Sequence, residues 1–326
     1  MKSFARILVV ALAAALAGPA ASAQAVSGGE FTVACSYDHM LPDDPIVFPG
    51  GQGMSHSHDF AGNRTTDAFA TNAGLLDGGS TCTRAADRSA YWVPTLLKDG
   101  VPFHAREFRA YYRSAGFDGR VVQPFPKGLR MIAGSSKVTD AGPYQPTSIA
   151  SWACTIPGGG KAGDEVEVDS IPADCGGQPL RARLVFPQCW NGTDLDSADH
   201  KSHMAYAVHG KCPADHPVVL PQLTLSIRYW VPDTNGLALA SGGTHSLHAD
   251  FMLAWAGSTQ EDLVGRCINA GVKCGNTATP PSAAGSPAPS RARATMTPAP
   301  SSPIFDVRRN SRAAALLCDV SGGARH

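Results

Sequence analysis

Leu223-Thr-Leu-Ser-Ile-Arg-Tyr-Trp-Val231 alternates apolar and polar side chains from Leu223 to Tyr229. Side chains of a β-strand point alternately to its two faces, so the apolar residues of this segment would share one face and the polar residues the other. Residues 181–186, Arg-Ala-Arg-Leu-Val-Phe, alternate similarly and end before Pro187. Both segments therefore predict β-strands.

Working outward from these two segments, further short strands are predicted between turn signals. Gly and Pro punctuate nearly every gap, as at Pro49-Gly50-Gly51 and Asp77-Gly78-Gly79. Long helical periodicity is missing, and one short helix is predicted over 258–270, where Ser258 and Glu261 have the spacing of a capping box. We expect a mainly β fold, a single disulfide-bonded β-sandwich or jelly roll with few short helices. The additional predicted strands span 108–112, 119–122, 129–132 and 149–154.

The N-terminal segment has the pattern of a signal peptide. Lys2 and Arg6 form a basic start, and an apolar run over 7–17 is too short to span a bilayer. Ala21-Ser22-Ala23 matches the small-residue cleavage pattern. We predict that residues 1–23 are removed on export. Because no second long apolar run follows, we expect a secreted, extracellular protein without a membrane anchor.

The composition changes again at Asn276. Residues 276–326 are rich in Pro, Ala, Ser and Thr and predict a disordered tail, which leaves 24–275 as one β domain. The chain has 27 basic and 27 acidic residues, but the tail holds an excess of arginine, so the body is acidic. Nucleic-acid binding depends on neutralising phosphates, and we therefore expect no nucleic-acid partner.

Nine cysteines are present, eight of them in the body. In an exported chain an even set predicts disulfides, and no C-x-x-C pair points to a thiolate metal site. Eight cysteines allow about 105 pairings. We favour Cys267–Cys274 as a local bridge, followed by Cys154–Cys175 and Cys189–Cys212.

Six histidines fall in three short stretches, each with at least one acid. Histidine is the commonest metal ligand and changes charge nearest neutral pH. The stretches are far apart in sequence, so only folding could join them into one polar site. They are Ser-His-Ser-His-Asp-Phe over 55–60, Asp-His-Lys-Ser-His-Met-Ala-Tyr over 199–206, and Thr-His-Ser-Leu-His-Ala-Asp-Phe over 244–251.

Across roughly 35–275 the chain resembles the secreted family named "domain of unknown function nineteen ninety-six". The resemblance implies no assigned activity, but bacterial and fungal relatives, some of them beside carbohydrate- or wall-binding modules, imply a polysaccharide or cell-wall glycan as partner. It does not extend into the tail. The matching pieces, in chain order, are Asp44-Pro-Ile-Val47 with Pro49-Gly50, 55–60 with Gly62-Asn63, Ser89-Ala-Tyr-Trp-Val-Pro94, 125–132, Phe186-Pro-Gln-Cys-Trp-Asn-Gly192, 199–206, Cys212-Pro213 with His216-Pro217, and His248-Ala-Asp-Phe251.

One interpretation of the histidine stretches is a divalent metal site. On strands, His56 and His58 would share one face, as would His248 and Asp250. All four are candidate ligands, and the H-x-H pair with one or two of the distant ligands would make a tetrahedral set with an open position. The H-x-H spacing alone is common, and H-E-x-x-H is absent.

A second interpretation is acid–base catalysis on a polysaccharide. A lyase needs a base, an acid and a partner for the substrate carboxylate; His58 or His203 could be the base, Tyr206 the acid, and Asn63 or Arg64 the partner. A hydrolase needs two carboxylates, and Asp59 and Asp250 are the candidate pair. The remaining candidates are His56, His200 and His248 for catalysis and Trp190 and Lys201 for substrate binding.

These patterns leave three hypotheses for function. The first is a carbohydrate-active enzyme, a polysaccharide lyase or hydrolase, that acts on cell-wall or extracellular polysaccharide through a His/Asp/Tyr cleft. The second is a non-catalytic wall-binding or carbohydrate-binding protein. The third is an extracellular metal-binding protein. All three require the histidine stretches to meet at one cleft.

Overall fold

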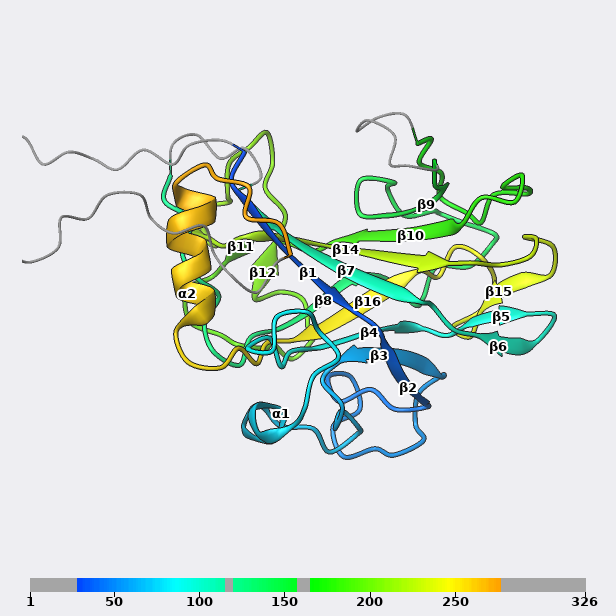
Figure 1. Ribbon diagram of the computed structural model, residues 1–326, viewed down its shortest axis with the longest axis horizontal. Helices are drawn as coiled ribbons and strands as arrows, with labels where there is room; N and C mark the ends of the chain where they lie inside the picture. The colour runs from blue at the N-terminus through cyan, green and yellow to red at the C-terminus, as the bar shows by residue number, and fades with distance from the viewer. Residues whose placement is uncertain (1–27, 115–119, 157–164, 277–326) are drawn as a thin grey trace, which may run out of the picture. The chain divides into compact units, whose positions relative to one another are not determined.

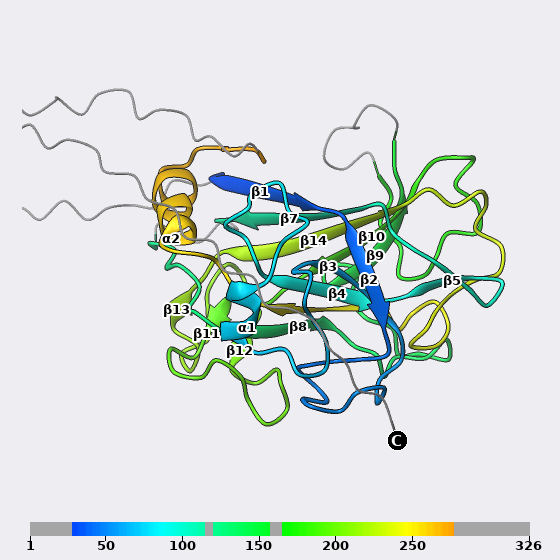
Figure 2. The same ribbon diagram turned by 60° about the horizontal axis from the view of Figure 1, so that its bottom comes forward.

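The computed structural model describes residues 28–114, 120–156 and 165–276. The predicted signal peptide and the predicted tail beyond Asn276 lie outside these residues. Within them the fold is mainly β, as predicted, and forms a β-sandwich with two five-stranded antiparallel sheets, two three-stranded sheets and few helices. Figures 1 and 2 show the two main layers from two directions.

The first main sheet has β14 (Gln222–Tyr229) at its centre, which confirms the most regular predicted strand. Leu223, Leu225 and Ile227 are fully buried on its inner face, whereas Arg228 lies on the outer face. The predicted strands at 108–112, 149–154 and 181–186 also belong to this sheet, with small shifts at their ends. The order across the sheet is β1 (Glu30–Cys35), β7 (Glu107–Arg113), β14, β10 (Leu180–Val185) and β9 (Ala150–Cys154) (Figure 1).

The second main sheet is covered on both faces. Its inner face contributes Phe251 to the core between the sheets. On its outer face, Phe60 and Trp92 form a smaller core with Ile46, from the segment between β2 and β3, and Leu75, from α1 (Asn72–Asp77). The order is β2 (Tyr37–Leu41), β3 (His58–Gly62), β4 (Ala90–Pro94), β16 (His248–Met252) and β8 (Arg130–Gly134).

The smaller sheets lie at the ends of the main strands. One orders β12 (Met204–Ala205), β11 (Cys189–Trp190) and β13 (Val218–Val219), and the other orders β15 (Leu237–Leu239), β5 (Leu96–Lys98) and β6 (Val101–Phe103).

The helix predicted over 258–270 is confirmed, as α2 (Thr259–Leu263) followed by the π-helical η1 (Val264–Asn269). The predicted capping box is wrong, because the Ser258 side chain does not cap the helix and instead lies 3.5 Å from Asp262 Oδ2. No helix of the described part is long and apolar enough to cross a bilayer.

The strand predicted over 119–122 does not form in its described part, Arg120–Val122. The backbone of Val122 pairs with a side chain instead of a neighbouring strand. Its N–H donates to Asn269 Oδ1 and its carbonyl accepts from Asn269 Nδ2, both at 2.9 Å. An amide side chain satisfies the same donor and acceptor that a ladder would use, so Val122 is buried without extending a sheet.

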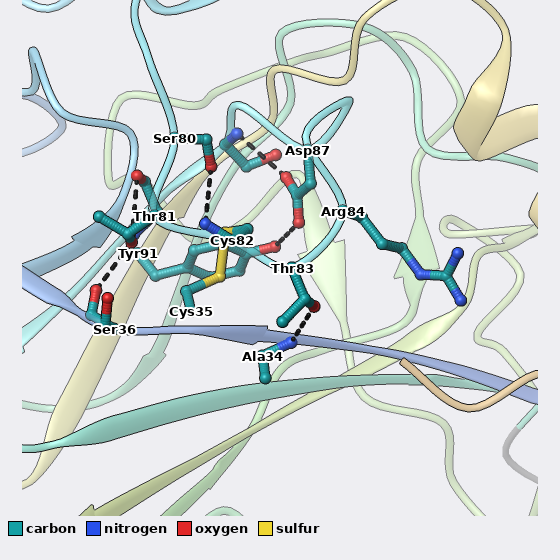
Figure 3. Close-up of a disulfide and its surroundings, with 12 residues drawn as sticks. Ala34, Cys35, Ser36, Ser80, Thr81, Cys82, Thr83, Arg84, Asp87 and Tyr91 are labelled. Atoms are coloured by element: carbon teal, nitrogen blue, oxygen red, sulfur yellow. Dashed lines mark hydrogen bonds between the residues drawn. A yellow bond between two sulfur atoms is a disulfide. The ribbon is translucent and has the colours of Figure 1, made fainter. Parts of the chain in front are cut away.

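Four disulfides cross-link the described residues, and the three predicted pairs are confirmed as Cys154–Cys175, Cys189–Cys212 and Cys267–Cys274. The fourth joins Cys35, at the end of β1, to Cys82 (Figure 3). Four disulfides are typical of proteins that fold in an oxidising compartment.

A buried polar network lies beside the fourth disulfide. The Tyr91 hydroxyl donates to Asp87 Oδ2 at 2.7 Å, as Figure 3 shows, and lies 2.6 Å from the Tyr112 hydroxyl. Asp87 Oδ1 accepts from the backbone N–H of Ser89. Because Asp87 is fully buried, desolvation raises the pKa of its carboxyl to about 6. This network ties the loop after β3 to both main sheets.

Candidate metal centre

Three histidines from distant parts of the chain bring their Nε2 atoms together at one end of the second main sheet. Nε2 of His248 lies 3.2 Å from Nε2 of His56 and 3.4 Å from Nε2 of His58. The rings of His56 and His58 are 4.3 Å apart. The H-x-H pair therefore points to one side, as predicted, and meets the third stretch there.

The sheet positions two of these rings rigidly. His58 begins β3 and His248 begins β16, the strands that flank β4. His248 pairs with Gly134, whose φ of 76° lies in the left-handed region that favours glycine. A Cβ at this position would lie 2.5 Å from the carbonyl oxygen of Leu247. Glycine at the end of β8 thus allows the edge strand to approach the start of β16 closely.

Backbone carbonyls fix the tautomer of both buried rings. Nδ1 of His58 donates to the Asp43 carbonyl at 2.9 Å, and Nδ1 of His248 donates to the Ser246 carbonyl at 2.8 Å. A carbonyl can only accept, so the hydrogen is on Nδ1 and the lone pair is on Nε2. Metal-ligating histidines commonly donate their other nitrogen in this way. The two Nε2 lone pairs face each other, an arrangement that a cation between them would satisfy.

Burial keeps these imidazoles neutral. Desolvation lowers the pKa of His56, lowers that of His58 well below its ordinary value, and lowers that of His248 to about 3. Neutral imidazole is the form that binds metal. For His58 and His248, which both carry their hydrogen on Nδ1, a proton shared between the Nε2 atoms would charge a desolvated ring, so protonation is the less favourable way to satisfy these two lone pairs. No carbonyl holds Nδ1 of His56 among the described residues, so His56 can donate from Nε2 to His248 as a neutral ring or turn its lone pair to a cation.

The spacing of the nitrogens fits zinc. Zinc–nitrogen bonds are about 2.0–2.1 Å long, and at a tetrahedral angle two ligand nitrogens lie about 3.3 Å apart. The two measured Nε2–Nε2 distances, 3.2 and 3.4 Å, bracket that value.

A buried carboxylate completes the polar cluster. Asp250 is fully buried, and neither of its oxygens has a hydrogen-bond partner among the described residues. Burial raises its pKa well above the ordinary value, and the charge of Asp44 raises it further. One ligand atom each of Asp44, His58 and Asp250 lies within 4.8 Å of the others. An unpaired buried carboxylate is costly and needs an explanation, and a cation held by the histidines beside it would supply one.

The histidines stand at the wall of an open cleft of about 700 Å³. Residues from all three histidine stretches line it: His56 from the first, His200 and Lys201 from the second, and His248 and Asp250 from the third. His200 has a φ of 57°, which is uncommon outside glycine, and its Nδ1 lies 3.0 Å from Asp196 Oδ1. The other lining residues are Asp44, Val47, Phe48, Met54, Ser55, Ile132, Ser135, Ser136, Lys137 and Asp199.

Two candidates from the second stretch lie away from this cleft. His203 is 1% exposed, and its Nε2 donates to the carbonyl of Arg130 at 2.7 Å, which makes it a structural residue. Tyr206 lines a smaller hollow beside the cleft and donates its hydroxyl to the Val185 carbonyl at 2.8 Å. Burial raises its pKa far above the ordinary value. Neither residue is placed to serve as the base or acid that the lyase hypothesis required.

The structure also separates the predicted carboxylate pair. Asp250 shares a sheet face with His248, whereas Asp59 follows His58 in β3 and points to the opposite face because side chains alternate along a strand. There Asp59 accepts from Thr95 Oγ1 at 2.9 Å and pairs with His104 Nδ1 at 3.0 Å. The hydrolase pair is therefore corrected: the two carboxylates cannot face one substrate.

Of the predicted substrate-binding residues, only Lys201 lines the cleft. Asn63 is fully buried, and its amide donates to the carbonyls of Leu75 and Arg88. Arg64 is exposed at the surface 4.0 Å from Asp38. The indole of Trp190 donates to the carbonyl of Asp194 in the small sheet. These three residues are corrected from substrate binding to structural or surface positions.

Asp44 is the main site residue that the sequence interpretation missed. The motif Asp43-Asp44-Pro45 has the composition of a turn, and Asp44 Oδ1 does accept from the backbone N–H groups of Ile46 and Val47, each at 2.9 Å. Its place in the segment 44–47, where the resemblance to the family begins, gives no chemical signal by itself. Only the fold brings this carboxylate to the cluster.

Fold and site together define a disulfide-bonded β-sandwich with a histidine-lined cleft. The chain belongs to the family described as "Domain of unknown function (DUF1996)", whose sequence profile matches residues 44–255. This range begins at Asp44 and includes all three histidine stretches. We found no match to the chain among curated proteins or among solved structures.

Proposed function

We propose that this protein is a secreted metalloprotein that binds one zinc-like divalent ion through His56, His58 and His248, with Asp250 beside it, and acts on extracellular polysaccharide in the adjoining cleft. The observation that carries this proposal is the convergence of three histidine Nε2 atoms, two of whose separations match tetrahedral ligand spacing. Three protein ligands leave a coordination position for substrate, which is typical of catalytic sites.

The residues around such a centre would have different roles. The carbonyls of Asp43 and Ser246 hold two of the rings in the ligating tautomer. Asp250 offers an unpartnered carboxylate on the same sheet face as His248. A divalent ion held here would polarise a substrate oxygen. Without Tyr206, His203 or Asp59 in the cleft, the titratable side chains that remain there beside the proposed ligands are Asp44, Lys137, Asp199, His200, Lys201 and Asp250.

Secretion and the substrate class rest on other observations. The signal-peptide pattern of residues 1–23 and the four disulfides support export. The cleft is large enough for several sugar units and carries three serine hydroxyls, from Ser55, Ser135 and Ser136, that match the hydroxyls of a glycan.

Metal analysis tests the centre directly. Exported protein is stripped with a chelator, loaded with zinc, dialysed and analysed for zinc per chain. We expect about one equivalent, and we expect its loss in His56→Ala and in His248→Ala. His209→Asn is the matched control, because His209 is an exposed histidine with a φ of 51° that asparagine accepts. Stoichiometric zinc in the His56→Ala/His248→Ala double variant contradicts the proposal.

Activity is tested on zinc-loaded and zinc-free protein against a panel of uronate and neutral glycans. Unsaturated products indicate a lyase, and new reducing ends without unsaturation indicate a hydrolase. We expect turnover of at least one glycan only in the loaded protein. Retention on cell-wall material without any turnover contradicts the enzymatic part and favours a non-catalytic binding protein.

A further inference from the structure

The cleft beside the candidate metal centre adjoins a second hollow. That hollow has a volume of about 210 Å³, and it shares Ile132 and Lys201 with the cleft as lining residues. Lys201 Nζ donates to the carbonyl of Gly134 at 2.6 Å, at the end of β8. Since β8 is the edge strand of the second main sheet, the lysine lies across an edge with one hollow on each side.

The acidic and basic side chains of the cleft differ in how many partners the protein itself gives them. Asp199 Oδ1 accepts from the backbone N–H groups of Lys201 and Ser202 and from two serine hydroxyls. Asp44 accepts from two backbone N–H groups. In contrast, Lys137 and Lys201 form no ion pair within the described part of the chain. The rim carboxylates are thus satisfied by the protein, whereas the ammonium groups are available to a ligand.

We propose that the cleft and the second hollow together form one groove for a linear carboxylated glycan, an oligouronate, whose carboxylates pair with Lys137 and Lys201. The polar lining of the cleft, with hydroxyls from Ser135 and Ser136, suits the sugar ring between carboxylates. The second hollow, lined by Gln145, Pro146, Ile149, Pro187, Met204 and Tyr206, would hold the next units of the chain. This inference specifies the substrate class of the proposed function and rests on it for the position of the reacting end.

Two features of binding follow. Two ammonium groups favour a carboxylated chain over a neutral chain of equal length, because a neutral sugar offers the lysines no opposite charge. Two joined hollows favour a longer chain over a shorter one, because the longer chain fills both. An isolated anion site would show the first preference without the second.

The probes are trigalacturonate, hexagalacturonate and cellohexaose, with binding to zinc-loaded protein measured by calorimetry. We expect hexagalacturonate to bind at least about tenfold more tightly than either other probe. Lys137→Met/Lys201→Met should weaken hexagalacturonate about tenfold or more and leave cellohexaose unchanged. Pro146→Trp, at the exposed rim of the second hollow, should abolish the advantage of hexamer over trimer. Lys127→Met is the matched control, because Lys127 lies outside both hollows.

Equal affinity for hexagalacturonate and cellohexaose overturns the inference, as does unchanged hexagalacturonate binding in the double lysine variant. Equal affinity for trimer and hexamer overturns the continuous groove. The zinc content of each sample is measured in parallel, so failure of the metal centre is recorded separately. Selective hexagalacturonate binding by protein that holds no zinc supports the groove and contradicts only the metal proposal.

Discussion

The Nε2 atoms of His56 and His248 lie 3.2 Å apart although 192 positions separate the two residues in the chain. Together with His58 they form a cluster of imidazole nitrogens that a zinc ion would hold as ligands. We therefore expect zinc to stabilise the fold. At a free concentration about 100-fold above the dissociation constant, the gain is about 2.7 kcal/mol, visible as a higher Tm in thermal unfolding.

His248→Ala should remove this zinc-dependent rise in Tm, while His209→Asn should retain it. An equal rise in His248→Ala would show that zinc binds elsewhere.

Asp250→Asn is expected to separate stability from metal binding. The Asp250 carboxylate is buried without a hydrogen-bond partner, so its replacement by a neutral amide should stabilise the zinc-free protein by about 1–3 kcal/mol in urea unfolding at pH 8. The same change should reduce the stabilisation that zinc provides. A destabilised zinc-free variant would mean that the carboxylate is already satisfied in the free protein.

Asp87 should make the fold less stable as pH rises. Its pKa is raised from 3.8 to about 6 in the folded protein, so the folded state holds the proton more tightly than the unfolded chain. The stabilising contribution is complete below pH 3.8 and is lost as pH rises to about 6, which amounts to about 3 kcal/mol. Asp87→Asn should remove that part of the pH dependence, because asparagine can still accept from Ser89 and donate to Tyr91.

Urea unfolding of both proteins from pH 4 to pH 8 tests this expectation. The difference between the two curves cancels the other buried acids, and a difference that does not vary with pH would contradict it.

The disulfides should differ in their contribution to stability. Cys35–Cys82 closes a loop with a sequence separation of 47, and Cys267–Cys274 closes one of 7. Chain entropy gives about 4 kcal/mol for the longer loop and about 2.4 kcal/mol for the shorter. Urea unfolding of the two double Cys→Ala variants should therefore show the larger loss for Cys35/Cys82. A larger loss for Cys267/Cys274 would indicate that packing around η1 outweighs loop length.

Asn63 is expected to support the fold and not the ligand. Its side chain donates to the carbonyls of Leu75 and Arg88 and accepts from the Thr65 N–H, so Asn63→Ala should cost about 3 kcal/mol of unfolding free energy. Arg64→Ala, at an exposed neighbour, should change stability by less than about 0.5 kcal/mol. Glycan affinity of the folded fraction should be the same in both; a selective loss in Asn63→Ala would restore it as a binding residue.

Local patterns in the sequence predicted the strands and which side chains of each strand share a face. Alternation over 223–231 predicted β14, and the H-x-H and H-x-D spacings predicted that His56 and His58, and His248 and Asp250, would share faces. Short sequence separation also favoured the three disulfides that were named correctly. These features depend on neighbours along the chain, which a sequence displays directly.

Tertiary structure decided which of these faces meet. The alternation of side chains along a strand does not tell which strands flank β4 or which face turns inward. Those depend on pairings between segments about 190 positions apart. For that reason Asp59 and Asp250 were paired in the sequence interpretation but lie on opposite sides of a sheet, and Tyr206 lines the smaller hollow and not the cleft at the histidines. Asp44 lies in the cluster with His58 and Asp250, although its sequence has the composition of a turn. The residue types were set by the sequence. The site was set by the long-range pairing that places β3 and β16 on either side of β4, which no local periodicity encodes.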